Sequence, residues 1–268
     1  MDITQIAELE TSYNWILVGL SFLVAVFGSY TSLQLMRGIR TAANNAKLKW
    51  VIAAAFSLGG GAIWTMHFIG MIAYETGMNV GYAPGLTFLS LAISVIVVGV
   101  GIYILSKKPD SIAILLIAGI FAGLGVASMH YSGMEAMVVA ADITYDPTLF
   151  VASVVIAVVA ATAALWLAFN LEGNMQMLAA SVVMGIAVCG MHYTGMAAMK
   201  MTPNGKVLET GSMMNPLTLG LFIFCFSMLL LVLSLIVTLS QLQKRMYEEL
   251  EDEEEDDDEE DAKQPQMA

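Results

Sequence analysis

Long apolar runs alternate with short polar segments along the chain up to about residue 240. Seven of the runs are long enough to cross a bilayer, which takes about 20 helical residues. They cover approximately residues 13–36, 49–74, 85–105, 111–140, 148–169, 175–199 and 216–240. Backbone groups in lipid have to be hydrogen-bonded within their own segment, so these runs predict helices. The pattern therefore predicts an all-α membrane protein with seven transmembrane helices.

The composition agrees with a chain built mostly of membrane spans. Hydrophobic residues make up 58% of the chain and charged residues 13%, whereas soluble domains are roughly 45–50% apolar and about 25% charged. These values exclude a soluble enzyme, a disordered chain and a nucleic-acid-binding domain. The net charge of −12 does not describe the membrane part, because 13 of the 23 acidic side chains lie in residues 248–261. The membrane part is close to neutral, and residues 241–268 are predicted to form a helical extension and a disordered acidic tail.

The distribution of basic residues predicts the orientation in the membrane. Cytoplasmic loops carry an excess of Lys and Arg, and here the basic residues gather after the first, third and seventh predicted helices. They are Arg37, Arg40, Lys47, Lys49, Lys107, Lys108, Lys244 and Arg245. We therefore expect the N-terminus, a short outer segment of residues 1–12, to lie outside and the C-terminus to lie in the cytoplasm.

The three histidines of the chain each lie in the same short motif, Met-His-aromatic-x-Gly-Met. His67, His130 and His192 are separated by 63 and 62 residues and lie near the ends of the second, fourth and sixth predicted helices. This spacing predicts three two-helix repeats, about residues 13–80, 81–144 and 145–205, followed by a seventh helix. An even number of helices per repeat gives every copy the same orientation, so we expect a pseudo-threefold axis along the membrane normal.

Two glycines accompany each histidine at fixed distances. Gly60, Gly123 and Gly185 lie seven residues before the histidines, and Gly70, Gly133 and Gly195 lie three residues after them. Small residues allow membrane helices to approach closely. We therefore expect the three even-numbered helices to touch one another at the first set of glycines, with the histidines gathered near the outer surface.

The three in-phase copies of this motif strongly resemble the MHYT domain, a bacterial seven-helix membrane sensor module, over about residues 13–240. The first copy departs from the family name, because Phe68 and Ile69 stand where the other copies have Tyr and Ser or Thr. The resemblance implies a sensor in the bacterial cytoplasmic membrane. Family members often carry a cytoplasmic output domain, whereas only residues 241–268 follow the last span here. We therefore expect a stand-alone form that is not an enzyme and signals through a separate cytoplasmic protein.

The residue types of the motif favour a metal site. Imidazole binds copper, zinc and iron, and the soft thioether of methionine suits Cu(I), so histidine mixed with methionine favours copper. The resemblance implies the same metal, with a diatomic gas (O2, CO or NO) or the redox state as the signal. The candidate ligands are His67, His130, His192, Met66, Met71, Met129, Met134, Met191 and Met196. The methionine before each histidine points about 100° away from it around the helix, so not all nine can bind one ion.

Other interpretations stay open on the sequence alone. Haem with two axial histidines ranks below copper, because no feature of the sequence fixes a porphyrin. A copper transporter or a copper-buffering protein is the main functional alternative, although the spans lack the polar path that a conduit needs. The histidines could also be structural hydrogen-bond partners, and Cys189 is expected to pack in the core. An apolar stripe could pair with a second copy or a partner; it comprises Leu235, Leu239, Leu242, Met246 and Leu250.

Overall fold

The computed structural model describes residues 11–41, 47–171, 173–207 and 213–230, together with scattered positions between 232 and 247. The chain separates into two compact units, Met1–Ser227 and Met228–Ala268, and the helical bundle lies in the first. Residues 1–10 and the acidic tail at 248–261 lie outside the described residues, as do Leu235, Leu242 and Leu250 of the apolar stripe.

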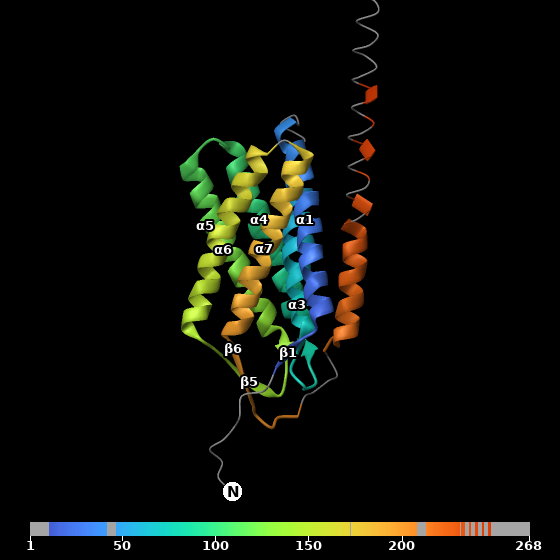
Figure 1. Ribbon diagram of the computed structural model, residues 1–268, viewed down its shortest axis with the longest axis vertical. Helices are drawn as coiled ribbons and strands as arrows, with labels where there is room; N and C mark the ends of the chain where they lie inside the picture. Colours follow the sequence, from blue (N-terminus) through green and yellow to red (C-terminus); the bar gives the residue numbers. More distant parts are fainter. Residues whose placement is uncertain are drawn as a thin grey trace, which may run out of the picture. The chain divides into compact units, whose positions relative to one another are not determined.

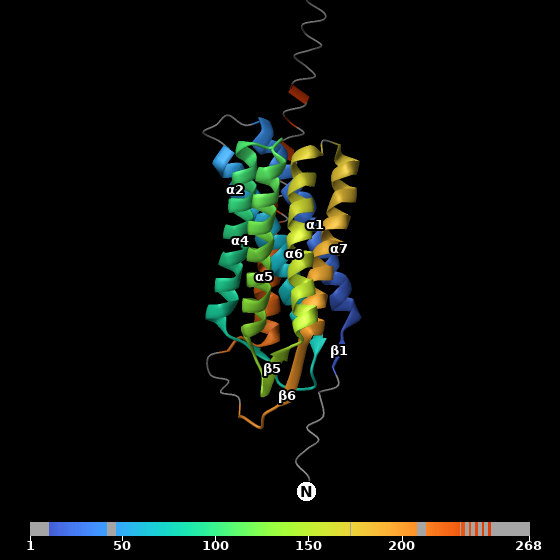
Figure 2. The ribbon, with the colours of Figure 1, turned by 90° about the vertical axis from the view of Figure 1, so that its left-hand side faces the viewer.

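Most of the described chain is helical (Figures 1 and 2). In chain order the helices are α1 (Trp15–Thr41), α2 (Lys47–Ala55), the π-helix η1 (Phe56–Trp64), α3 (Thr65–Ala73), α4 (Pro84–Lys107), α5 (Ile112–Glu135), α6 (Pro147–Asn170) and α7 (Asn174–Ala198). Because α2, η1 and α3 continue without a break, they form one span, and the described residues contain six helices long and apolar enough to cross a membrane. A shorter apolar helix covers Pro216–Leu230, within the seventh predicted span.

The fourth predicted span, residues 111–140, was too long. Its helix α5 ends at Glu135, and Met137–Val138 form a short strand, β4. Met137 is buried in that strand, so the sequence stays apolar after the helix has ended. Hydropathy cannot separate a buried strand from the end of a membrane helix, and this is the physical reason for the error.

Three short antiparallel ribbons close the same end of the bundle. β1 (Ser12–Tyr13) pairs with β2 (Tyr74–Glu75), β3 (Gly81–Tyr82) with β4, and β5 (Ala141–Tyr145) with β6 (Met199–Pro203). In each case one strand precedes an odd-numbered span and the other follows the next span along the chain. Each repeat is therefore a strand, two helices and a strand. The hydropathy pattern predicted no strands, because most of them are too short to show an alternating pattern.

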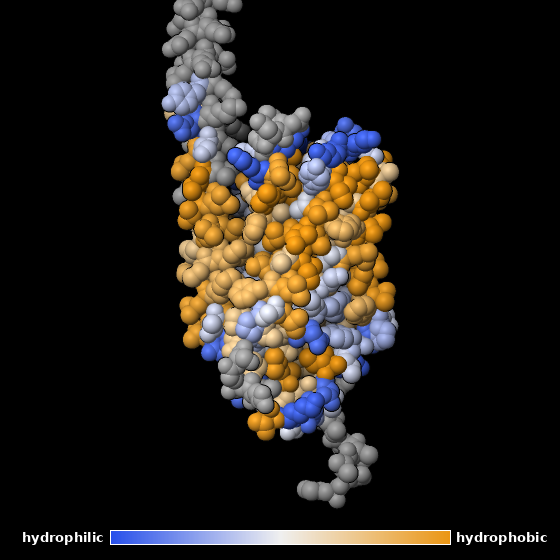
Figure 3. Space-filling model, turned by 180° about the vertical axis from the view of Figure 1, so that it is seen from behind, coloured by the Kyte–Doolittle hydropathy of each residue, from blue (hydrophilic) through white to orange (hydrophobic). Residues whose placement is uncertain are grey.

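The six spans form a closed ring in chain order. Each span packs against the next, and α7 returns to α1. Figure 2 shows α4, α5, α6 and α7 side by side in this order. Large apolar side chains such as Ile96, Val159 and Val183 point outward and are exposed. Figure 3 shows a broad hydrophobic band between hydrophilic ends on one face of the molecule. This surface suits the hydrocarbon of a bilayer.

The span formed by α2, η1 and α3 is the most buried of the six. A Cβ on Gly28 of α1 would lie 2.6 Å from the backbone nitrogen of Ala62, so α1 and η1 touch backbone to backbone. Two serine hydroxyls reinforce this contact region: Ser57 donates to the Gly28 carbonyl at 3.0 Å, and Ser94 donates to the Gly59 carbonyl at 2.7 Å. Glycine and serine therefore hold the segment before His67 between α1 and α4.

Candidate metal centre

The three histidines of the motif meet inside the bundle. His67 comes from α3, His130 from α5 and His192 from α7, and their side chains are at most 1% exposed. The Nδ1 atom of His67 lies 3.1 Å from that of His192 and 3.1 Å from that of His130. The third side of this triangle, between His192 and His130, measures 3.4 Å. The structure thus brings together side chains that are more than 60 residues apart in the sequence.

The rings are arranged like the blades of a propeller. Their centroids are 4.9, 5.0 and 5.2 Å apart, and their planes stand at 77°, 90° and 89° to one another. The three helices contribute equivalent residues in equivalent positions. This arrangement agrees with the pseudo-threefold axis that the even-numbered repeats predict.

The glycine three residues after each histidine makes room for the histidine of another repeat. A Cβ on Gly133 would overlap Nε2 of His67, a Cβ on Gly195 would overlap Nε2 of His130, and a Cβ on Gly70 would overlap Nε2 of His192. The contacts run in a cycle from the first repeat to the second, the second to the third and the third to the first. Any larger residue at these positions would displace an imidazole.

The glycine seven residues before each histidine has a different neighbour from the one expected. A Cβ on Gly123 would meet the backbone of Val158 in α6, and a Cβ on Gly185 would meet Val26 in α1. Gly60 faces Phe226 and Leu91. The expected contact of the even-numbered helices at these glycines is therefore wrong. The glycines face neighbouring helices instead, because sharing a helix face with the histidines does not determine which helix packs against that face two turns away.

Polar contacts fix the residue after two of the three histidines. The Tyr131 and Tyr193 rings pack edge-on against the preceding imidazoles, and their hydroxyls bond to Ser153 at 2.6 Å and Ser21 at 3.0 Å. The first repeat has Phe68 instead, and there Trp64 Nε1 donates to Ser90 at 3.0 Å.

The sequence analysis missed these serines. Each is the seventh residue of its helix: Ser21 in α1, Ser90 in α4 and Ser153 in α6. Aligning the helix starts, marked by Pro84 and Pro147, would have found the pattern in two of the three repeats.

The six candidate methionines are all buried, at most 2% exposed. The two methionines of the third motif line two different cavities. Met191 lines an apolar cavity within the bundle, whereas Met196 lines a hollow of about 420 Å³ at the strand end of α1 and α7. The structure thus groups the three histidines as one possible ligand set. A ligand role for the methionines stays a prediction.

The hollow at the strand end has an aromatic lining, with Tyr13, Tyr74 and Tyr193 in contact with one another through Tyr13. Burial raises the pKa of Tyr13 well above its ordinary value, and the neighbouring hydroxyls of Tyr74 and Tyr193 raise it further. Tyr13 therefore stays a neutral phenol at physiological pH, and the hollow carries no phenolate charge from it.

The geometry of the three Nδ1 atoms fits a metal ion. Three imidazole nitrogens bound at 2.0–2.1 Å to one tetrahedral ion stand about 3.3–3.4 Å apart, close to the 3.1–3.4 Å observed. Within the part of the chain that the structure describes, these histidines are the one group of three His, Cys, Asp or Glu side chains arranged to hold an ion. The chemistry is consistent as well, because neutral imidazole is the commonest metal ligand in proteins.

Without a cation, most of the imidazole nitrogens in the cluster would have no hydrogen-bond partner within the described part of the chain. A neutral imidazole has one donor and one acceptor nitrogen, and one proton can bridge only two of the three Nδ1 atoms. The Nε2 atoms do not relieve this, because none of them has a hydrogen-bond partner among the described residues. Buried polar atoms without partners are costly. An ion shared by the three Nδ1 atoms would offset this cost.

A family model described as MHYT, a bacterial signalling protein N terminal repeat, matches residues 60–118, 123–181 and 185–246. Each match begins at the glycine seven residues before a histidine, so the internal repeat is present three times. No solved structure matches the chain.

Of three curated relatives, two are named as enzymes of cyclic di-GMP and one as a signaling protein. The chain is 35% identical over 244 residues to the bifunctional diguanylate cyclase/cyclic di-GMP phosphodiesterase MucR of Pseudomonas aeruginosa, covering 88% of this chain and 36% of MucR. It is 34% identical over 235 residues to the signaling protein YkoW of Bacillus subtilis, covering 84% of this chain and 29% of YkoW. It is 36% identical over 216 residues to the cyclic di-GMP phosphodiesterase NbdA of Pseudomonas aeruginosa, covering 78% of this chain and 27% of NbdA. The chain thus spans about a quarter to a third of the length of these relatives.

Proposed function

The chain belongs to the MHYT family of bacterial signalling proteins, and from this premise we propose that it is a membrane-embedded sensory module that holds one copper ion between His67, His130 and His192. The observation that carries the proposal is the triangle of Nδ1 atoms with sides of 3.1, 3.1 and 3.4 Å. Three repeats each contribute one ligand, so the ion would link all three even-numbered spans.

Copper is proposed over other metals because of the surroundings of the cluster. Each histidine is flanked in its motif by buried methionines. Among the described residues, the group of possible metal ligands contains no Asp or Glu. Thioether and imidazole donors suit Cu(I), whereas magnesium, calcium and manganese prefer oxygen. Haem is less favoured, because a macrocycle has to separate its two axial ligands, and here each pair of Nδ1 atoms lies within 3.4 Å.

The chain's own residues would hold the ion and shield it from water. The imidazoles supply the nitrogens, the glycines three residues after them keep the rings in place, and the aromatic residues that follow the histidines cover their edges. When bound, the ion supplies an oxidation-state change or an open coordination position for a gas such as O2, CO or NO. A holding role is favoured over transport, because the cavity formed by η1, α4, α5, α6 and α7 is lined only by apolar residues.

The signal would leave the bundle at the end opposite the strands. We propose that the strand end faces outward, as the basic residues Arg37, Arg40, Lys107 and Lys108 at the other end predict. The printed names of MucR and NbdA concern cyclic di-GMP. We accordingly propose that the module controls the turnover of this second messenger by a catalytic domain elsewhere, and that it performs no catalysis itself.

Metal content tests the proposal most directly. Detergent-purified protein is analysed for metals and by optical spectroscopy, next to a variant in which His67, His130 and His192 are replaced by alanine. Cys189→Ala is the matched control, because Cys189 lies near His192 in sequence but outside the histidine group. We expect about one copper per chain in the unsubstituted protein and in Cys189→Ala, and its loss in the triple variant.

Two other results would redirect the interpretation. A Soret band that disappears in the triple variant would replace copper with haem. The absence of any metal or chromophore from unsubstituted protein, with both proteins equally folded, would leave the histidines as structural hydrogen-bond partners and would overturn the proposal.

A further inference from the structure

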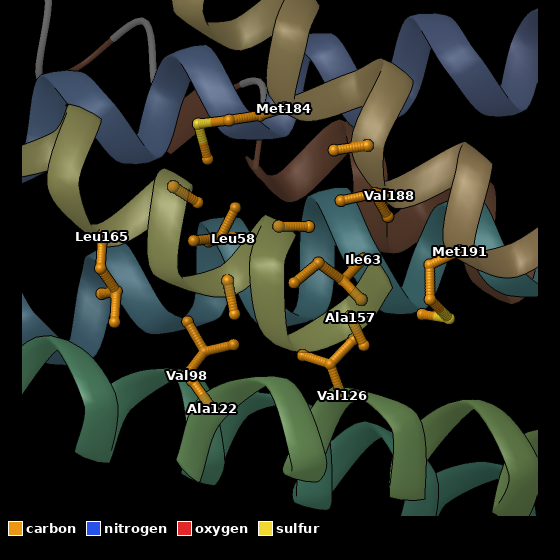
Figure 4. A pocket seen from close by; sticks show the side chains of 14 residues that line it. Leu58, Ile63, Val98, Ala122, Val126, Ala157, Leu165, Met184, Val188 and Met191 are labelled. Carbon is orange, nitrogen blue, oxygen red and sulfur yellow. The ribbon is translucent and has the colours of Figure 1, made fainter. Parts of the chain in front are cut away.

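A cavity of about 50 Å³ lies inside the bundle (Figure 4). Its walls come from η1, α4, α5, α6 and α7, and its 14 lining residues are all alanine, valine, leucine, isoleucine or methionine. In Figure 4 their side chains surround one common space. No signal in the sequence predicted it, because the residues that line it are ordinary membrane-helix residues.

The cavity lies directly beside the histidine cluster. Ile63, Val126 and Val188 line it, and each stands four residues before the histidine of its own repeat. Four residues of α-helix rise about 6 Å, so the cavity begins roughly one helical turn from the imidazoles. Met191, which also lines the cavity, precedes His192 directly. The three spans that carry the imidazoles therefore also form part of the cavity wall.

The chemistry of the wall excludes water and admits apolar molecules. A buried water needs two to four polar partners, and no lining side chain carries an oxygen or a nitrogen. An apolar cavity of about 150 Å³ stays dry and takes up benzene or xenon. With about 50 Å³, this cavity has room for roughly three to five water-sized spheres, at 10–15 Å³ each. It is too small for benzene and large enough for a xenon atom or a diatomic molecule.

The cavity has a lipid-facing side between α6 and α7. Ala160, Ala161 and Val188 are partly exposed, whereas Leu58 and Val98 on the opposite wall are buried. The surface of the spans suits hydrocarbon, so this opening leads into the bilayer rather than into water. Small apolar molecules dissolve better in hydrocarbon than in water, which concentrates them at the opening.

We propose that this cavity is a binding site for one small apolar molecule of the size of a diatomic gas, taken up from the bilayer between α6 and α7. The site itself follows from the size, lining and position of the cavity. That its occupant is also the molecule detected at the histidines rests on the function proposed above. The bilayer then supplies the ligand from the side, and no aqueous channel is needed.

Xenon is the probe for the test. The full chain in detergent is titrated with xenon and followed by xenon NMR, and xenon-pressurised crystals locate the atom by its anomalous scattering. Two variants fill the cavity from α6, Ala161→Leu and Ala164→Leu, because both residues line it. Ala163→Leu is the matched control, with the same substitution on the same helix at an exposed position outside the lining.

We expect saturable xenon binding in the unsubstituted protein and in Ala163→Leu, and loss of that binding in both filling variants. In unsubstituted protein, dioxygen should compete with xenon and benzene should not, which tests the site without any variant. Xenon uptake that does not saturate, or that both filling variants retain, would overturn the proposal, as would an ordered water in the cavity.

Metal analysis of the same samples separates this proposal from the previous one. Copper without saturable xenon binding would reject the cavity site and leave the metal site standing. Saturable xenon binding without copper would support the cavity site and reject the metal site. Filling variants that keep their copper while losing xenon would support both.

Discussion

At the scale of single residues, the cluster depends on three glycines, which have no Cβ, as much as on the three histidines. The imidazole of each repeat lies against a glycine of another repeat, at a distance that leaves no room for a Cβ. The burial of the rings is complete, so they have no alternative space nearby in which to move without disturbing the close packing of the interior.

We predict that Gly195→Ala displaces His130 and weakens the metal site. The new methyl group would overlap Nε2 of His130, and overpacking of this kind costs about 1–3 kcal/mol. The measurements are the copper content and the melting temperature of the purified variant, both of which should fall.

Gly190→Ala is the control for this prediction. Gly190 lies on the same helix, two residues before His192, and a Cβ there would meet nothing within 4 Å. The variant should retain its copper and gain up to about 1 kcal/mol of stability through the restricted unfolded chain. Equal copper contents in the two alanine variants would refute the interlocking of glycine and imidazole.

The sequence predicted the members of the cluster but not its internal contacts. The spacing of His67, His130 and His192 indicated one layer, and the structure confirms that they meet. Which glycine faces which imidazole depends on the order of the repeats around the axis and on helix rotation, and a repeat pattern contains neither. Gly60, Gly123 and Gly185 were assigned the wrong neighbours for the same reason.

At the scale of the elements, the first repeat differs from the others through the π-helix η1. π-helices are rare and are found most often at functional sites, and this one directly precedes the segment that carries His67. It contains three consecutive glycines, Gly59–Gly61, which are poor formers of α-helix. The glycine run was visible in the sequence, but the change of helix type was not, because a periodicity of apolar residues cannot be read through glycines.

We predict that Gly28→Ala destabilises the bundle by forcing α1 away from η1. The added Cβ would lie 2.6–2.9 Å from backbone atoms of Gly61 and Ala62. Backbone cannot move aside as the end of a side chain can, so we expect a cost at the upper end of about 1–3 kcal/mol. Thermal unfolding in detergent measures it.

Gly19→Ala supplies the comparison on the same helix, because a Cβ at Gly19 would meet nothing within 4 Å. It should leave the melting temperature unchanged or slightly raised. If Gly28→Ala unfolds at the same temperature as Gly19→Ala, then the close approach of α1 and η1 does not contribute to stability.

The helices themselves were the most predictable elements, and the strands the least. Long apolar runs identify spans because lipid requires both length and apolar composition. The ribbon formed by β3 and β4 has only two residues on each side, too few for a pattern of alternating residues. Its register is fixed by the helices that it joins, which is information from the tertiary structure.

At the scale of the whole molecule, the orientation is the first property to test. We predict that a cysteine in place of Asn79 reacts with an impermeant maleimide on intact cells, whereas one in place of Lys108 reacts only after permeabilisation. Both positions are exposed and lie at opposite ends of α4, and both variants are made in a Cys189→Ala, Cys225→Ala background. Labelling of Lys108→Cys on intact cells, with protection of Asn79→Cys, would reverse the orientation that the basic residues predict.

The three repeats and the shared ion together predict how copper affects the stability of the whole bundle. An ion held by all three histidines links helices that are 63 and 62 residues apart. Copper at 100 times its Kd would therefore stabilise the folded chain by about 2.7 kcal/mol, a rise of several degrees in Tm for a domain of this size. We expect His67→Ala, His130→Ala and His192→Ala each to remove most of this rise, since each takes away one of three equivalent ligands. Thermal unfolding with and without copper measures the effect, with Cys189→Ala as the variant that keeps it. If one of the three histidine variants keeps the full rise, the ion is bound by two repeats only, and the third even-numbered span is not linked to the metal.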